Sequence, residues 1–490
     1  MGLQQKAIAG AAWAAVQNWG SQFGALIVFL VLARLLTPED FGLVALANVF
    51  LAFVQVFLNQ GFPQALIQRK NLEPEHIDTA FWTNIAVGVV LAIAGMIAAP
   101  WVAAAFNRTA LTPILRWFSL LLVVSSLVDV QQALLERAFA YRYLAVRSLL
   151  GLLISGVVGI TLALSGAGVW SLVAQQLIYE TVGMLVLWRA SDWRPQFRFS
   201  IRHFQDLFKF GRSILAFNVL GFVNSRSDDL LIGYFLGPTA LGFYSLAYRI
   251  LSVMTQVLIE TSERVALPTF SRMQHNLSQM RSAFYKVARF TSLLAFPFFL
   301  GIAVLAPKVV PFIFGSQWMA SVPVLQVLAI VGIFRALSRF KGAVFMAVGQ
   351  PEWKVKLGLI ASSLNFVGFA IAVRWGIVAV SGAYLVRALI MFPIVQLVLN
   401  RLIQVSIGQY LRQAIAPLAA SLTMSGVLLA LGRSLEQLDI RLQLIVLILA
   451  GSGVYLLALQ VLAPHVIQEV ISTAQSTFPK LNLKILSKRL

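Results

Sequence analysis

Windows of about 20 apolar residues follow one another along almost the whole chain, separated by short polar connectors. A helix of that length spans the hydrocarbon core of a bilayer, which is about 30 Å thick. We place fourteen such windows, to within two, at residues 12–36, 41–67, 79–105, 112–135, 143–166, 168–188, 211–236, 240–262, 286–306, 322–347, 355–374, 377–400, 412–432 and 442–463. The mean hydropathy of +0.84 and the charged fraction of 11% agree, because about a quarter of the residues of a soluble protein are charged. The chain is therefore predicted to be an all-α polytopic membrane protein with about 14 transmembrane helices.

The cations of the connectors follow an alternating pattern. Connectors from odd- to even-numbered windows hold almost no Lys or Arg. The even-to-odd connectors carry Arg69, Lys70, Arg137, Arg142, Arg189, Arg194, Arg198, Arg202 and Lys209. The positive-inside rule then places both termini in the cytoplasm. This orientation accounts for the excess of 38 Lys and Arg over 18 Asp and Glu, so nucleic acid is not expected as a partner.

The residues that bind metal ions most often are scarce. There is no Cys, which excludes a disulfide framework and a thiolate metal site. The four histidines lie in polar connectors or at a segment end and show no ligand spacing: His76, His203, His275 and His465. We therefore expect no metal and no cofactor.

One stretch of the chain repeats after 200 residues. LLTPEDFGLVALA at 35–47 aligns without a gap to FLGPTALGFYSLA at 235–247, which places Gly42 opposite Gly242 and Pro38 opposite Pro238. Six windows fit in one period, so the two halves have parallel topology and a pseudo-two-fold axis along the membrane normal. The predicted organisation is a six-helix bundle at 1–200, a second at 201–402, two further helices at 403–463, and a basic cytoplasmic tail at 464–490 that faces anionic headgroups or is simply solvated.

Several ionisable residues lie deep inside the predicted windows, where each costs at least about 2.5–3.5 kcal/mol. They are Glu180, Arg226, Asp228, Asp229, Arg249, Arg335, Arg339 and Arg387. Asp229 and Arg249 lie at matching depths on either side of the Gly237-Pro238 turn, so we expect an ion pair between them, which leaves Arg226 for a substrate. The alternative is that such a pair only fixes helix packing.

The deep arginines of the second half suggest a site for an anion. Arg335 and Arg339 are four residues apart and therefore share one helical face, where like charges repel. Paired guanidinium groups bind phosphate oxygens well, because each can donate two parallel hydrogen bonds. Arg387 lies six residues before Pro393, which can kink the helix. A role of Arg387 in helix packing and a role in substrate binding have equal weight.

The deep carboxylates suggest a different role. Glu180 has Gln175 and Gln176 about one turn away, and it either binds a coupling ion, H⁺ or Na⁺, or makes a packing hydrogen bond. Asp228 and Asp229 are the other candidates for ion coupling. No catalytic constellation can be assembled from these residues, so the chain is not expected to be an enzyme.

The motifs resemble those of the polysaccharide transporter family of the multidrug/oligosaccharidyl-lipid/polysaccharide (MOP) superfamily, which includes flippases for O-antigen and exopolysaccharide repeat units. The resemblance rests on ARLLTPEDFGLVALA (33–47), ALIQRKNLEPEHIDTAFWTN (65–84), QQALLERAFAYR (131–142), GVWSLVAQQL (168–177) and DDLLIGYFLGPTALGFYSLAYRI (228–250). It implies a MATE-like fold with two six-helix bundles, two extra C-terminal helices and a cationic cavity. The implied substrate is an undecaprenyl-diphosphate-linked glycan in the bacterial inner membrane, with membrane lipids, a polysaccharide polymerase and export machinery as further partners.

The leading hypothesis is an alternating-access flippase whose substrate diphosphate contacts Arg226, Arg249, Arg335, Arg339 and Arg387. A multidrug or organic-cation antiporter is disfavoured, because a cation gains from carboxylates and aromatic faces rather than from arginines. A lipid II flippase has a similar carrier, and charge cannot separate the two substrates. A non-transporting scaffold or polymerase accessory is the alternative from a different class.

Overall fold

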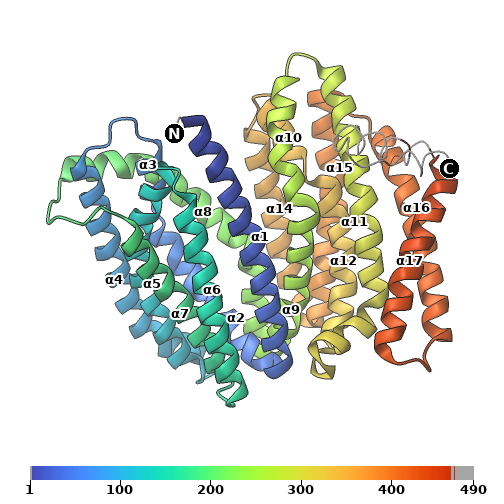
Figure 1. The fold of residues 1–490 in the computed structure, drawn as a ribbon, viewed down its shortest axis with the longest axis horizontal. Helices are drawn as coiled ribbons and strands as arrows, with labels where there is room; N and C mark the ends of the chain where they lie inside the picture. Colours follow the sequence, from blue (N-terminus) through green and yellow to red (C-terminus); the bar gives the residue numbers. More distant parts are fainter. Residues whose placement is uncertain (1–2, 465–467, 469–490) are drawn as a thin grey trace. The chain divides into compact units, whose positions relative to one another are not determined.

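The structure is a computed structural model that describes residues 3–464 and 468, and within them every regular element is helical (Figure 1). The predicted basic tail at 464–490 lies almost entirely outside the described residues. The helices of the first half are α1 (Leu3–Leu35), α2 (Pro38–Leu58), α3 (Phe62–Gln68), α4 (Pro74–Ala105), α5 (Leu111–Arg137), α6 (Tyr141–Leu164), α7 (Val169–Ala190) and α8 (Ile201–Phe235).

The second half continues with α9 (Gly237–Thr255), a π-helical turn (Gln256–Glu260), α10 (Thr261–Arg272), α11 (Leu277–Phe314), α12 (Ser321–Ser338), α13 (Lys341–Ala347), α14 (Glu352–Ala372), α15 (Ile377–Ile403), α16 (Ile407–Ser434) and α17 (Ile440–Leu462). Two 3₁₀ turns, Ser316–Trp318 and Val373–Trp375, complete the elements. Each predicted window is largely helical, but the windows 41–67, 240–262 and 322–347 each extend over more than one element. The windows 143–166 and 168–188 form the separate helices α6 and α7.

Twelve helices in the described part of the chain are long and apolar enough to cross a membrane, so this is a multi-pass membrane protein. The predicted windows 211–236 and 240–262 correspond to α8 and α9, which are not among the twelve. These two helices carry Arg226, Asp228, Asp229 and Arg249, and the predicted number of 14 is therefore approximate.

The chain forms two compact units. The first contains the residues up to Leu246 together with Ile313–Trp318 and Ser362–Val380, and the second contains Ala247–Phe312, Met319–Ala361 and the residues from Ser381 onward. Helix α8 belongs to the first unit by its contacts with α2, α3 and α4. The predicted division at residue 200 rests on the sequence repeat rather than on these contacts, and it stays a prediction.

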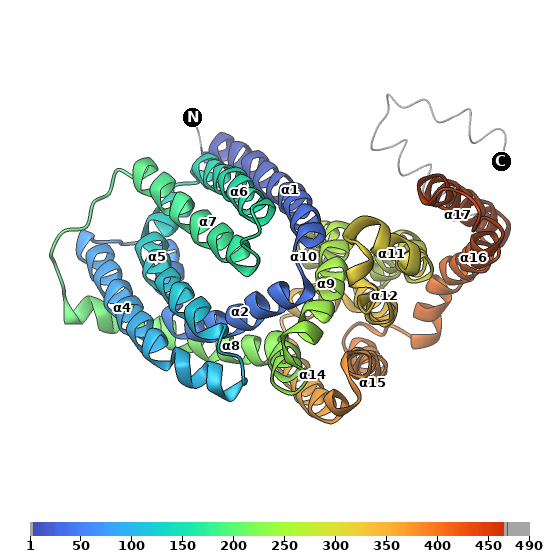
Figure 2. The same cartoon turned by 90° about the horizontal axis from the view of Figure 1, so that it is seen from below.

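In the first unit, neighbouring helices pack in the order α1, α6, α7, α5 and α4, and α2 contacts α5, α7 and α8 (Figure 2).

Polar side chains at the start of α2 determine where this helix begins. Thr37 caps α2 by accepting a hydrogen bond from the Asp40 backbone N–H at 3.2 Å, while the Asp40 carboxylate accepts from the Thr37 N–H at 3.0 Å. This capping box, followed by Pro38 at the first helical position, begins the helix sharply.

The turn between α8 and α9 is the second copy of that element. Gly237, the first residue of α9, adopts φ +83°, a left-handed conformation that favours glycine, and Pro238 follows it in the first turn. A Cβ atom at Gly42 would overlap the Pro238 carbonyl, and one at Gly242 would overlap the Pro38 carbonyl. The two copies of the motif therefore pack against each other reciprocally, as a two-fold relationship requires.

In the second unit, α16 and α17 pack against α11. Met424, Leu428 and Leu447 form the centre of this cluster. The hydroxyl of Tyr455 donates to the Leu293 carbonyl at 2.8 Å, and Lys308 Nζ donates to the Gly432 carbonyl at 3.0 Å. The two helices that follow the predicted repeats are thus attached through α11.

Candidate substrate and coupling sites

The charged stretch of α8 is internally compensated. Arg226 forms an ion pair with Asp229, three residues later on the same helix, at 3.1 Å. Asp228 is buried and accepts a hydrogen bond at 2.7 Å from the hydroxyl of Tyr244, a fully buried residue of α9. The contact across this hairpin is therefore Tyr244 with Asp228.

The sequence predicted an ion pair between Asp229 and Arg249, whereas the ion pair that Asp229 forms among the described residues is with Arg226. A residue three positions along a helix lies one turn away on the same face, so Arg226 reaches Asp229 without any tertiary contact. Arg249 belongs to the second unit, and its side chain is exposed. The roles of these residues in binding a diphosphate or an ion stay predictions.

Arg335 lies in α12 between two tyrosines from other helices. Its Nη2 donates to the hydroxyl of Tyr248 in α9 at 3.1 Å and to the hydroxyl of Tyr384 in α15 at 2.5 Å. The guanidinium carbon also lies 5.3 Å and 5.1 Å from the centroids of the two rings. Two of the five guanidinium donors are thereby used, and the other three have no partner among the described residues. The two rings fix the direction in which those donors point.

Arg387 extends this arrangement, because its guanidinium carbon lies 4.4 Å from the centroid of the same Tyr384 ring. Its Nε is buried without a hydrogen-bond partner among the described residues. Lys341, at the start of α13, is close enough to Arg387 to be repelled by it. We call Tyr248, Arg335, Lys341, Tyr384 and Arg387 the α12–α15 basic cluster. In the part of the chain that the structure describes, neither Arg335 nor Arg387 pairs with a carboxylate.

Arg339 lies one helical turn after Arg335, at the point where α12 ends and α13 begins. The helix is interrupted at Arg339 and Phe340 before it resumes at Lys341. The predicted spacing of two arginines on one helical face therefore coincides with a helix break. Interrupted membrane helices often carry the binding site of a transporter.

A second polar cluster lies in the first unit, between α5, α6 and α7. Arg147 Nη2 is 3.3 Å from the Glu180 carboxylate, and Arg147 Nη1 donates to the Gln132 amide oxygen at 2.5 Å. Asp129 interacts electrostatically with both Arg147 and Glu180, and its Oδ2 is buried without a hydrogen-bond partner in the described residues. Arg147 therefore forms an ion pair with Glu180 and also acts electrostatically on Asp129.

This α5–α7 cluster changes the expectation for Glu180. Its partner is Arg147 rather than the nearby glutamines, of which Gln176 donates to Asn48 at 3.0 Å. Asp129 lies inside the predicted window 112–135, so depth alone could have identified it. Arg147 lies near a window end, where a cation is unremarkable.

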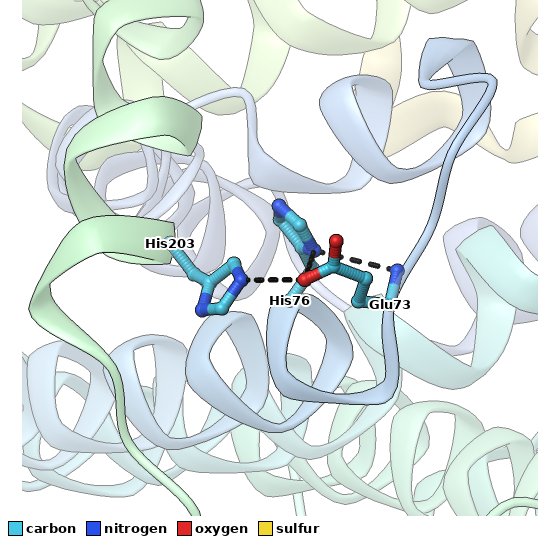
Figure 3. A group of neighbouring side chains, drawn as sticks. All are labelled: Glu73, His76 and His203. Carbon is cyan, nitrogen blue, oxygen red and sulfur yellow. Dashed lines mark hydrogen bonds and ion pairs between the residues drawn. The ribbon is translucent and has the colours of Figure 1, made fainter.

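The structure also brings together residues that the sequence did not connect. Glu73, His76 and His203 lie side by side at the starts of α4 and α8 (Figure 3). The Glu73 carboxylate is 2.9 Å from His203 Nε2 and 4.0 Å from His76 Nδ1. The sequence spacing of the histidines does not reveal this group, because His203 comes from a distant helix.

Comparisons of the sequence with known proteins agree on one family. Residues 31–323 match the family described as "Polysaccharide biosynthesis protein". The chain is 31% identical to the succinoglycan biosynthesis transport protein ExoT of Rhizobium meliloti over 67% of each chain. It is 26% identical to the teichuronic acid biosynthesis protein TuaB of Bacillus subtilis, over 93% of this chain and 96% of TuaB. It is also 26% identical to the lipopolysaccharide biosynthesis protein WzxC of Escherichia coli, over 74% of each chain.

Solved structures share the fold. The lipid II flippase MurJ, in an inward closed conformation, aligns with a TM-score of 0.74 at 15% identity, covering 92% of this chain and 99% of MurJ. An inward-facing multidrug resistance MATE family transporter of the MOP superfamily aligns with a TM-score of 0.57 at 16% identity, covering 79% of this chain and 96% of the transporter. The predicted MATE-like fold is therefore confirmed.

Proposed function

Because this chain belongs to the polysaccharide biosynthesis protein family, we propose that it flips polyprenyl-diphosphate-linked oligosaccharide repeat units across the bacterial inner membrane. The direction is from the cytoplasmic to the periplasmic leaflet, by alternating access, for assembly of a cell-surface polysaccharide. The relatives named for succinoglycan transport, teichuronic acid biosynthesis and lipopolysaccharide biosynthesis support this substrate class. The alternation of cations along the connectors supports an orientation with both termini in the cytoplasm.

The α12–α15 basic cluster is the observation that carries the proposal. Arg335 and Arg387 place cationic charge inside a membrane unit, and both contact Tyr384. Burial of a cation in the membrane is costly unless an anion compensates it during function. A diphosphate provides that compensation, since guanidinium groups bind phosphate oxygens with paired hydrogen bonds. Arg339, one turn away, is the third member of this binding surface.

The α5–α7 cluster is our candidate for ion coupling. Removing or adding a proton at Asp129 or Glu180 changes the charge that surrounds Arg147, and such a change can favour one conformation over another. Na⁺ binding between the carboxylates has the same electrostatic effect. Asp228 is less suited to this role, because the buried Tyr244 hydroxyl already donates to it. None of these assignments includes a catalytic step.

The decisive experiment combines a cellular and a purified assay. The triple variant Arg335→Ala, Arg339→Ala, Arg387→Ala should abolish polymer export at normal protein levels. The Arg433→Ala variant, which removes a cation at the end of α16, should export normally. Normal export by the triple variant would overturn the proposed site.

Proteoliposomes then test the substrate class. We expect purified protein to translocate undecaprenyl-diphosphate oligosaccharide and not lipid II. Faster translocation of lipid II would favour the alternative flippase, and absence of any translocation would favour a scaffold. Export of an organic cation against a gradient would instead identify an antiporter.

A further inference from the structure

The starts of α4 and α8 present three side chains with metal-binding atoms. Glu73 directly precedes α4, His76 lies in its first turn, and His203 lies in the first turn of α8 (Figure 3). Their candidate ligand atoms, a Glu73 carboxylate oxygen and one ring nitrogen from each histidine, all lie within 4.8 Å of one another. The side chain of His76 is only 2% exposed, whereas that of Glu73 is 61% exposed. The group is thus anchored in the protein and open on one side.

The distances suit a small divalent ion. Zinc bonds to histidine nitrogen and carboxylate oxygen at about 2.0–2.2 Å, so two ligand atoms of a tetrahedral site lie about 3.3 Å apart. The observed separations from the Glu73 carboxylate, 2.9 Å and 4.0 Å, fall on either side of this value. Three protein ligands with an open fourth position is a common arrangement for zinc.

The existing hydrogen bonds do not fully occupy the three groups. His76 Nδ1 accepts a long bond of 3.4 Å from the Glu73 backbone N–H, while His76 Nε2 and His203 Nδ1 are buried without partners among the described residues. A buried imidazole nitrogen without a partner lowers stability, because it has lost its hydrogen bonds to water. A metal does not satisfy these outer nitrogens. It replaces the 3.4 Å bond to His76 and the 2.9 Å hydrogen bond between His203 Nε2 and the Glu73 carboxylate with ligand bonds.

The nearby cations are largely compensated by acids. Arg69 pairs with Asp206 at 3.2 Å, and Arg198 pairs with Glu75 at 3.3 Å. Arg202 acts on Glu73 only electrostatically. The negative charge of Glu73 therefore remains available to a cation.

We propose that Glu73, His76 and His203 form a binding site for a divalent transition metal of the zinc class, with water or an external ligand as the fourth partner. The metal links the start of α4 to the start of α8. The connector between α7 and α8 already lies along α4, since the Gln196 N–H donates to Asp78 and the Ser200 N–H donates to Thr79, both at 3.2 Å. A bound metal therefore restrains the connector at 191–200, which joins the two sequence repeats.

Metal binding is measured on full-length, tag-free protein in detergent after treatment with a chelator. We expect one Zn²⁺ per chain by calorimetry, and a Co²⁺ absorption spectrum typical of tetrahedral nitrogen and oxygen ligands. The variants His76→Ala, His203→Ala and Glu73→Gln should each weaken Zn²⁺ binding at least about tenfold. The control His275→Ala changes a histidine outside the group and should bind as the wild type does.

A replacement of the ligand separates a metal site from a folding effect. The chain contains no cysteine, so His203→Cys introduces a single thiol. It should retain Zn²⁺ binding, and its Co²⁺ complex should show a thiolate charge-transfer band that the wild type lacks. Unchanged affinity in His76→Ala and His203→Ala would identify an adventitious ion and overturn the proposal. So would absence of the thiolate band in a folded His203→Cys protein.

Discussion

Gly42 lies against the backbone carbonyl of Pro238, and no side chain larger than hydrogen fits between them. The residues at the same positions of the other repeat, Gly242 and Pro38, make the same contact in reverse. A repeat detected as five shared residues at an offset of 200 thus has a physical basis, because each glycine is required by the proline turn of the other copy. Close backbone approach through small residues is a general way of packing membrane helices.

The first prediction concerns this contact. Gly42→Ala should destabilise the protein by about 1–3 kcal/mol, since the added methyl group overlaps backbone atoms that cannot rotate away. The control Gly358→Ala places the same methyl group on an exposed helix position with no atom within 4 Å. Thermal unfolding in detergent should therefore separate the two variants, with only Gly42→Ala melting earlier. Equal melting temperatures would show that the α2 contact relaxes freely.

Positions of helices could be predicted from the sequence because hydropathy is a local property of about 20 residues. Partners could not. Depth in a window identified Arg335, but Tyr248 and Tyr384 hold it from 87 and 49 residues away. The error at Asp229 is of a different kind, because its partner Arg226 lies only three residues away on the same helix and could have been identified from the sequence.

The second prediction tests the tyrosines that orient Arg335. Tyr384→Phe keeps the aromatic ring beside Arg335 and Arg387 but removes the 2.5 Å hydrogen bond. A hydrogen bond to a charged group contributes about 1.5–3 kcal/mol, so translocation should fall by roughly ten- to a hundredfold if orientation of the guanidinium limits diphosphate binding. Translocation in proteoliposomes, at matched protein content, measures this.

A matched control is Tyr234→Phe, which removes a hydroxyl from an exposed residue whose ring contacts Phe235. It should translocate at the wild-type rate. Full activity in Tyr384→Phe would mean that the hydroxyl contributes nothing to substrate binding, and Tyr248 could then be tested alone.

The third prediction concerns the α5–α7 cluster. Glu180→Gln keeps the shape of the side chain and removes the charge that faces Arg147 at 3.3 Å. If Glu180 carries the coupling ion, translocation should no longer respond to an imposed proton or Na⁺ gradient, while passive flipping persists. Glu39→Gln is the control, because Glu39 is an exposed residue in the first turn of α2 and forms no ion pair within the described residues. A full gradient response in both Glu180→Gln and Asp129→Asn would contradict this assignment.

The fourth prediction uses the acid dependence of Glu73. The hydrogen bond from His203 lowers the pKa of Glu73 below its ordinary value of 4.5. A carboxylate whose pKa is lower in the folded state contributes stability above its ordinary pKa, and loses that contribution as the pH falls through the lowered value. In the presence of a chelator, the wild type should therefore melt later than Glu73→Gln at neutral pH. The difference should narrow as the pH falls below 4.5 and through the lowered pKa, because protonated Glu73 resembles glutamine. Melting curves of both proteins between neutral pH and pH 3 give the comparison, and a difference that does not narrow over this range would show that the ionised form of Glu73 is not what stabilises the α4–α8 contact.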